Sequence, residues 1–145
     1  VDEVAALESA LVLAPDAPGE PESRVTAREI ADTWHLDAEL VCLTGCESYA
    51  GMRSASQGWL GLQQALLRAG ARSVLVSAWR VEDRAGALLM REFYARLGPG
   101  SDGEERARAL RDAQEAVRRY RAPDGSQPYA HPAYWAGFTL IGGPG

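Results

Sequence analysis

The sequence predicts an α/β domain in which a mostly parallel sheet lies between helices on both faces. Short apolar runs alternate with longer segments whose apolar residues recur every three or four positions, which is the pattern of strands joined by helical crossovers. The predicted strands are rich in Val and Leu, as buried strands of parallel sheets are. A chain of 145 residues is long enough for one domain with a core, and we see no internal repeat and no second domain.

The first predicted elements are a strand over 9–14 (Ser-Ala-Leu-Val-Leu-Ala) and a solvated loop over 15–23, which is rich in Pro, Gly and acidic residues. Thr26, followed three residues later by Glu29, is the pattern of a capping box, and it predicts a short helix that ends near Thr33. The first third of the chain is therefore expected to contribute one strand and one helix.

The centre of the chain predicts two buried strands separated by a helix. The runs over 40–44 (Leu-Val-Cys-Leu-Thr) and 73–78 (Ser-Val-Leu-Val-Ser-Ala) are short and apolar, as strands buried on both faces are. Between them, helically spaced apolar residues end at Gly70, and glycine is a common C-terminal signal of helices. These helical positions are Trp59, Leu62, Leu66 and Ala69.

The last part of the chain predicts two long helices and a closing strand. One helix begins at Glu82 and Asp83, whose acidic side chains suit a helix N-terminus, and it ends near Gly98. The next helix follows the breaker loop over 99–103 and alternates arginine and acidic residues on one face, so we expect that face to be solvated rather than a binding patch. The run over 135–141 predicts the closing strand.

Composition and charge exclude several classes of protein. The net charge of −5 and the absence of a basic stripe argue against a nucleic-acid-binding protein. No apolar run is long enough to span a bilayer, and no charged-then-apolar leader is present. Cys42 and Cys46 would lie about 13 Å apart on an extended strand, too far for a disulfide, and they lack partners at the spacing of a metal site. We therefore expect reduced thiols in a cytoplasmic protein, with no metal and no cofactor.

Cys46 is the candidate catalytic residue. It follows the central strand within a turn of small residues, and open α/β sheets place their ligands and their chemistry at the carboxyl ends of strands. Gly45 beside it leaves room for the backbone of a substrate to approach. The alternative is that Cys46 is a small buried hydrophobic residue, as free cysteines usually are, and its position alone does not decide between the two. Cys42 lies inside the strand and is expected to belong to the core.

Several blocks of the sequence, taken together and in order, resemble one family. The blocks are 43–48 (Leu-Thr-Gly-Cys-Glu-Ser), 58–79, 79–83 (Trp-Arg-Val-Glu-Asp), 89–94 (Leu-Met-Arg-Glu-Phe-Tyr), 109–114 (Ala-Leu-Arg-Asp-Ala-Gln) and 131–138 (His-Pro-Ala-Tyr-Trp-Ala-Gly-Phe). The set resembles the CHAT domains, caspase-like modules that are usually found behind tetratricopeptide repeats (TPR) in bacteria. The resemblance implies a caspase-like three-layer sandwich and a cysteine peptidase with a His/Cys dyad, in which Cys46 is the nucleophile.

The sequence departs from the family pattern in the histidine that would act as the general base of the dyad. In CHAT domains the catalytic histidine stands in a His-Gly motif upstream of the strand that matches residues 9–14, and no such motif occurs here. His35 would be about 20 Å or more from Cys46, and His131 is expected to order a turn, whereas a base must reach the proton of its nucleophile. We therefore expect residues 1–145 to be a partial CHAT domain without the upstream histidine-bearing segment.

Residues after the strand over 73–78 are candidates for binding the substrate. Glu82 and Asp83 follow the carboxyl end of that strand and are able to pair with an Arg or Lys of the substrate, although acidic residues also simply suit the start of a helix. Ser77 and Trp79 are expected to be walls of the same pocket, with a core position as the alternative for Trp79. Arg80 is instead able to bind an acidic residue, so the preference of the pocket stays open.

The sequence thus predicts a cysteine endopeptidase that cleaves a protein partner through a thioester on Cys46, whose backbone N–H is one oxyanion donor. A flanking TPR-like or sensor region is expected to position the histidine. The alternative is a caspase-like scaffold that binds proteins without cleaving them. A dinucleotide- or flavin-binding domain is disfavoured, because no glycine-rich loop opens a helix directly after a strand. Pairing with a second copy through an exposed strand edge is a further possibility for the partner.

Overall fold

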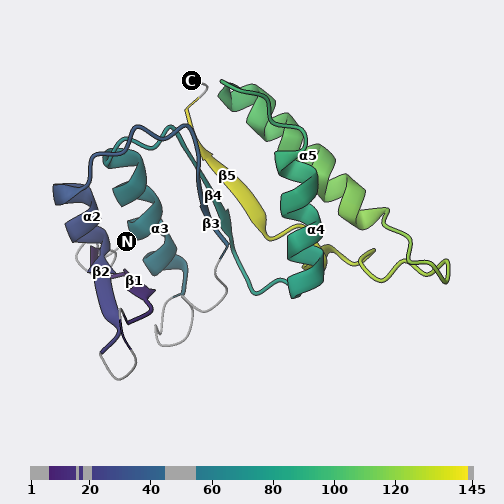
Figure 1. The fold of residues 1–145 in the computed structure, drawn as a ribbon, viewed down its shortest axis with the longest axis horizontal. Coiled ribbons are helices and arrows are strands. Elements are labelled where there is room, and N and C mark those ends of the chain that lie inside the picture. Colours follow the sequence, from purple (N-terminus) through teal and green to yellow (C-terminus); the bar gives the residue numbers. More distant parts are fainter. Residues whose placement is uncertain (1–6, 16, 18–20, 45–54, 144–145) are drawn as a thin grey trace. The chain divides into compact units, whose positions relative to one another are not determined.

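The computed structural model describes residues 7–15, 17, 21–44 and 55–143, with the backbone alone for 55–60. The chain forms two compact units, one of Val1–Val41 with Glu47–Val74 and the other of Cys42–Cys46 with Leu75–Gly145. Along the chain the elements are β1 (Ala10–Leu13), β2 (Ser23–Thr26), α2 (Ala27–Thr33), β3 (Val41–Leu43), α3 (Ala55–Arg68), β4 (Ser73–Ser77), α4 (Asp83–Tyr94), α5 (Gly103–Arg118), the 3-10 turn η1 (Pro132–Tyr134) and β5 (Phe138–Gly142) (Figure 1). The α/β class is therefore confirmed.

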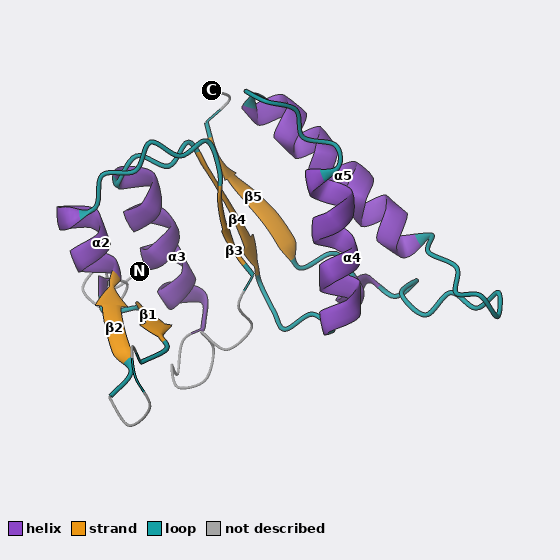
Figure 2. Cartoon of the chain, in the orientation of Figure 1, coloured by secondary structure: helices purple, strands orange, loops and turns teal. Residues whose placement is uncertain are grey.

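The first unit contains an antiparallel hairpin and two helices. β1 and β2 pair from Ala10 with Thr26 to Leu13 with Ser23 (Figure 2). Thr26 ends β2 and also caps α2, because its hydroxyl accepts a hydrogen bond from the backbone N–H of Glu29 at 3.1 Å. α2 packs against α3, and the buried side chains of this unit include Ile30.

The turn after α3 places the start of β4 beside the start of β3. Gly70 has φ +112°, and its flanking residue Ala69 accepts a hydrogen bond from Leu36 N–H at 2.6 Å. Ala38 and Ala71 then form a parallel bridge just before the two strands, so β3 and β4 run in the same direction.

The second unit contains most of a three-stranded sheet in the order β3-β4-β5. All five residues of β4 are buried, as the apolar run predicts. At the end of β4, Ala78 N–H donates to the carbonyl of Gly137, which directly precedes β5, at 2.8 Å. Because the end of one strand meets the start of the other, β5 runs antiparallel to β4.

Two long helices, α4 and α5, pack against each other and lie on the same side of these strands (Figure 1). Ala85, Leu89 and Phe93 of α4 are fully buried, and α5 contributes Ala113 and Val117 to the same core. The helix α5 begins with a capping box, in which Asp102 accepts from Glu105 N–H and Glu105 accepts from Asp102 N–H.

The expectation of a mostly parallel sheet needs correction for the described residues. Only β3 and β4 run parallel there, since β1 pairs with β2 in a separate antiparallel hairpin and β5 enters the sheet antiparallel. For β1 the physical reason is its short connection to β2, which favours antiparallel pairing, and β1 is too exposed to be a strand buried on both faces. The three-layer arrangement with helices on both faces stays a prediction.

Candidate functional site

A cavity of about 200 Å³ lies at the carboxyl ends of β3 and β4. Its walls come from the residue after β3, the last residue of β4, the first two turns of α4 and the first residue of β5. The lining residues are Thr44, Ser77, Val81, Asp83, Gly86, Ala87, Met90 and Phe138. This is the edge of the sheet at which an α/β protein is expected to hold its ligand.

Two of the predicted substrate-binding residues, Ser77 and Asp83, line this cavity. Ser77 is buried, and its hydroxyl donates a hydrogen bond of 2.7 Å to the carbonyl of Trp79, which holds the turn between β4 and α4 in place. Asp83 is the first residue of α4 and is exposed. The cavity therefore combines apolar walls with one exposed carboxylate.

Two more of the predicted substrate-binding residues, Glu82 and Trp79, have structural roles and do not line the cavity. Glu82 caps α4, because its Oε2 accepts from Ala85 N–H at 2.8 Å. Trp79 donates from Nε1 to the carbonyl of Ala133 at 2.9 Å and packs its ring over Gly137. Trp79 is 42% exposed, so it is not the core aromatic that was the alternative.

Gly45 and Cys46 lie outside the described residues, so the structure describes neither of them. The other cysteine, Cys42, is half-buried in β3 and accepts a hydrogen bond from the hydroxyl of Tyr94 at 3.1 Å. Burial raises the pKa of the Cys42 thiol, and the hydrogen bond from Tyr94 opposes part of that rise. The same hydrogen bond, with burial, raises the pKa of Tyr94 to about 12. Cys42 is thus a protonated thiol at neutral pH and not an activated nucleophile.

Neither histidine lines the cavity among the residues that the structure describes. The Nδ1 atom of His35 lies 3.2 Å from the carbonyl oxygen of Thr33, in the first unit. His131 caps η1, with Nδ1 accepting a hydrogen bond of 3.2 Å from Ala133 N–H, so it orders a turn as predicted.

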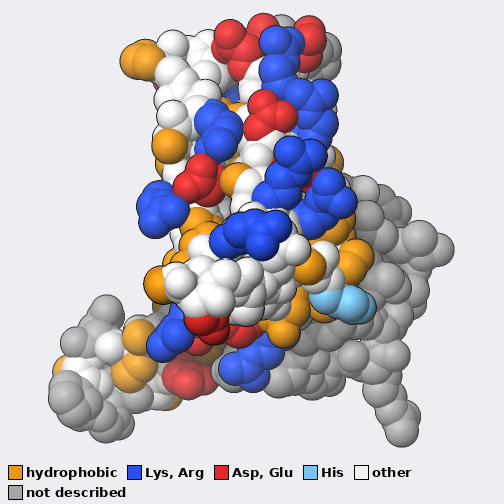
Figure 3. Space-filling view, turned by 90° about the vertical axis from the view of Figure 1, so that its right-hand side faces the viewer, with side chains coloured by type: hydrophobic (Ala, Val, Ile, Leu, Met, Phe, Trp, Pro, Cys, Tyr) orange, Lys and Arg blue, Asp and Glu red, His pale blue; other side chains and the backbone are white. Residues whose placement is uncertain are grey.

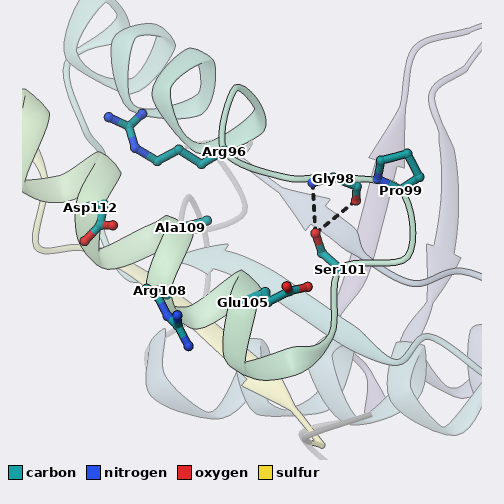
Figure 4. A pocket seen from close by; sticks show the side chains of 8 residues that line it. All are labelled: Arg96, Gly98, Pro99, Ser101, Glu105, Arg108, Ala109 and Asp112. Carbon is teal, nitrogen blue, oxygen red and sulfur yellow. Dashed lines mark hydrogen bonds between the residues drawn. The ribbon is translucent and has the colours of Figure 1, made fainter.

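A second cavity, of about 380 Å³, lies where α4 connects to α5, and charged side chains of both signs surround it (Figure 4). Arg96 pairs with Glu92, and Arg108 pairs with Glu104. Ser101 closes the loop through hydrogen bonds with Gly98. These contacts stabilise the connection between the helices, and they leave no excess of one charge for a ligand.

The arginine-rich face of α5 is a solvated surface, as predicted. Arg111 pairs with Asp112, and Arg118 and Arg119 both pair with Glu115. Arginine and acidic side chains accordingly alternate over the face in Figure 3. Exposed pairs of this kind contribute little to stability and form no patch of one sign.

Sequence reasoning missed the other six lining residues, Thr44, Val81, Gly86, Ala87, Met90 and Phe138. In the structure Thr44 follows β3 and Phe138 opens β5, whereas the sequence placed both inside predicted strands, over 40–44 and 135–141. Met90 had no signal, since an apolar helical position gives no indication of which neighbouring element it will face.

In the described ranges, no group of three or more His, Cys, Asp or Glu side chains is arranged to hold a metal ion. In the same part of the chain, no helix is long and apolar enough to cross a membrane.

Comparison with known proteins identifies the family. The profile described as "CHAT domain" matches residues 1–143, which is nearly the whole sequence. The chain belongs to the CHAT domain family.

Two mammalian relatives of this CHAT domain are both tetratricopeptide repeat protein 28, from Mus musculus and from Homo sapiens. Each is 34% identical over 127 residues, which are 88% of this chain and 5% of the relative. The chain thus spans about a twentieth of the length of these relatives, and their names support an association with TPR but mention no catalysis. Because both are mammalian, they do not support the expected bacterial setting. No solved structure matches the chain.

Proposed function

We propose that this CHAT domain is part of a cysteine endopeptidase in which Cys46 is the nucleophile. One observation supports the proposal above the others: Thr44, two residues before Cys46, lines the same cavity as Ser77 and Asp83. A substrate side chain in this cavity would therefore contact a residue that is two positions before Cys46 in the sequence. We infer that the chain is the cysteine-bearing, carboxyl-terminal part of the complete domain.

The proposed reaction follows from the chemistry of a thiolate. The sulfur of Cys46 attacks the carbonyl carbon of a peptide bond, and backbone N–H groups, that of Cys46 among them, stabilise the oxyanion. A histidine takes the thiol proton and gives it to the leaving amine as the C–N bond breaks. Water then adds to the thioester, releases the carboxylic acid and restores the thiol. We assign the base to a histidine outside this sequence, positioned by a flanking TPR-like region.

The cavity suggests the side chain that precedes the cleaved bond. Its volume of about 200 Å³ is below the size of small-molecule pockets and suits a single side chain. Asp83 lines the cavity and Arg80 does not, which favours a basic side chain over an acidic one. Apolar walls such as Met90 would contact the aliphatic part of that arginine or lysine.

The test uses the complete protein and a peptidyl-arginine acyloxymethyl ketone, which alkylates an active thiol. We expect Cys46→Ala to abolish both labelling and cleavage of a protein substrate. Cys42→Ala is the matched control, because it removes the other cysteine of the chain, which lies in β3, and should leave labelling intact. Equal cleavage by wild type and Cys46→Ala would end the proposal. Asp83→Asn should lower kcat/KM for arginine substrates and change an alanine substrate much less.

A second function, a protein-binding scaffold without catalysis, is supported by the positions of the two histidines. Neither lines the cavity among the described residues, so no base is placed there by this sequence. The same experiment separates the two functions. A scaffold would bind its partner equally with or without Cys46→Ala, and the ketone would label neither protein.

The setting of the protein is also a proposal. We propose a cytoplasmic protein with reduced thiols and without a metal or a cofactor. Val12 and Leu13 of the β1–β2 hairpin are exposed, which supports pairing with a second copy through this edge. Sedimentation of the wild type and of Val12→Lys would show a shift from dimer to monomer, and a wild-type monomer would contradict the pairing.

A further inference from the structure

A groove of about 660 Å³ lies between α4 and the segment that follows α5, within the second unit. One wall is a stripe of α4 with Arg84, Leu88 and Arg91, which are spaced four and three residues apart and therefore share a helix face. The other wall includes Tyr120 and Tyr129. We call this surface the arginine–tyrosine groove, and nothing in the proposed peptidase reaction uses it.

The tyrosine wall is held in place before any ligand arrives. The ring centroids of Tyr120 and Tyr129 lie 5.5 Å apart, and those of Tyr129 and Tyr134 lie 5.4 Å apart. The turn between the first two is closed by Asp124, whose Oδ1 accepts from the N–H and the hydroxyl of Ser126. A wall ordered in advance loses little conformational entropy when it binds a partner.

The charge of the arginine–tyrosine groove is positive, although the protein as a whole has a net charge of −5. Two arginines line it, and no Asp or Glu does. In the described residues, no ion pair or side-chain hydrogen bond engages Arg84, and Arg91 pairs only with its half-buried neighbour Glu92. The cavity of Figure 4 differs, because Glu105 and Asp112 line it together with its arginines.

We propose that the arginine–tyrosine groove docks an acidic segment of a partner protein, with carboxylates on Arg84 and Arg91 and apolar or proline side chains against the tyrosines. Guanidinium groups form paired hydrogen bonds with carboxylates, and tyrosine rings and Pro128 offer flat apolar surfaces. Ala87 lines both this groove and the cavity that contains Asp83, so a docked segment would lie on the neighbouring face of α4. The docking does not require catalysis by Cys46.

The test measures peptide binding to the complete protein. An array of decapeptides that combine Glu or Asp with Leu, Phe or Pro is compared with an array in which Lys replaces each acid, and the tightest peptide is then measured by fluorescence anisotropy. The double variant R84E/R91E should weaken binding by at least about tenfold, and R84Q/R91Q should weaken it less. The matched control is R108E/R111E, which reverses two exposed arginines of α5 and should bind as the wild type does. Binding should also weaken as salt is raised.

Each outcome of this experiment either supports or contradicts the proposed docking site. A loss in R84E/R91E with normal binding by R108E/R111E supports the docking site. Equal binding by all variants, an equal loss in both double variants, or Lys peptides that bind as tightly as acidic ones would overturn it. Cys46→Ala should bind the peptide normally, so an inactive thiol and an absent docking site give different results.

Discussion

Replacement of Gly70 by alanine tests the turn that sets β3 and β4 side by side. Gly70 has φ +112°, which L-residues rarely adopt, and a Cβ there would lie 2.1 Å from the carbonyl oxygen of Leu36. Leu36 cannot withdraw freely, because its own N–H donates to the carbonyl of Ala69 at 2.6 Å. Backbone strain of ~1–3 kcal/mol and overpacking of ~1–3 kcal/mol together give an expected loss of ~2–6 kcal/mol.

Gly125→Ala is the control for this substitution. Gly125 also has a positive φ, +83°, but a Cβ there meets nothing within 4 Å, so only the strain of ~1–3 kcal/mol is expected. Hydrogen exchange of the complete protein, followed by mass spectrometry, gives the free energy of local opening around each site. The loss at Gly70 should exceed that at Gly125. An equal or smaller loss at Gly70 would refute the steric reasoning and the role of Leu36.

Three further predictions concern other contacts. Tyr94→Phe removes the hydrogen bond that lowers the pKa of Cys42, so alkylation of Cys42 at pH 8 should slow. The pKa of Tyr94 is raised to about 12, so the contribution of Tyr94 to stability is complete below the ordinary tyrosine pKa of about 10 and is lost as the pH rises from about 10 to about 12. Wild type should show this loss of stability, and Tyr94→Phe should not. Gly137→Ala places a Cβ 2.8 Å from the Trp79 ring, so it should shift tryptophan fluorescence and cost ~1–3 kcal/mol, and an unchanged spectrum would contradict the contact. Asp102→Ala removes the capping box and should cost ~1 kcal/mol in the opening of α5 by hydrogen exchange, whereas Asp102→Asn should cost less.

Helices with strong local signals were predictable from the sequence. Thr26 caps α2 through Glu29, Gly70 follows α3 with a positive φ, and α4 begins at Asp83 with Glu82 as its cap. Each signal acts within one turn of helix, so it does not depend on the rest of the fold. The buried strand over 73–78 was equally clear, because its residues are apolar on both faces.

Strand pairing was harder to predict, because it depends on residues far apart in the chain. The run 9–14 has the composition of a buried strand, but its neighbour β2 spans Ser23–Thr26, between the predicted loop over 15–23 and the helix that Thr26 caps, where no strand was predicted. The direction of β5 depends on the hydrogen bond between Ala78 and Gly137, which no periodicity reports. Tertiary context decides such pairings.

The candidate site shows the same division between local and long-range signals. Because ligands of α/β proteins bind at the carboxyl ends of strands, Ser77 and Asp83 were predicted at the edge of the sheet where the cavity is found. They did not separate Asp83 from Glu82, although only one of these adjacent carboxylates is committed to the backbone, as the acceptor for Ala85 N–H. Glu82 caps α4 by accepting a backbone hydrogen bond, whereas the next acid, Asp83, stays exposed and lines the cavity. The cap thus fixes the end of α4 that presents Asp83, so Glu82→Ala should disturb the cavity indirectly, and Asp83→Asn should change its charge with the fold intact.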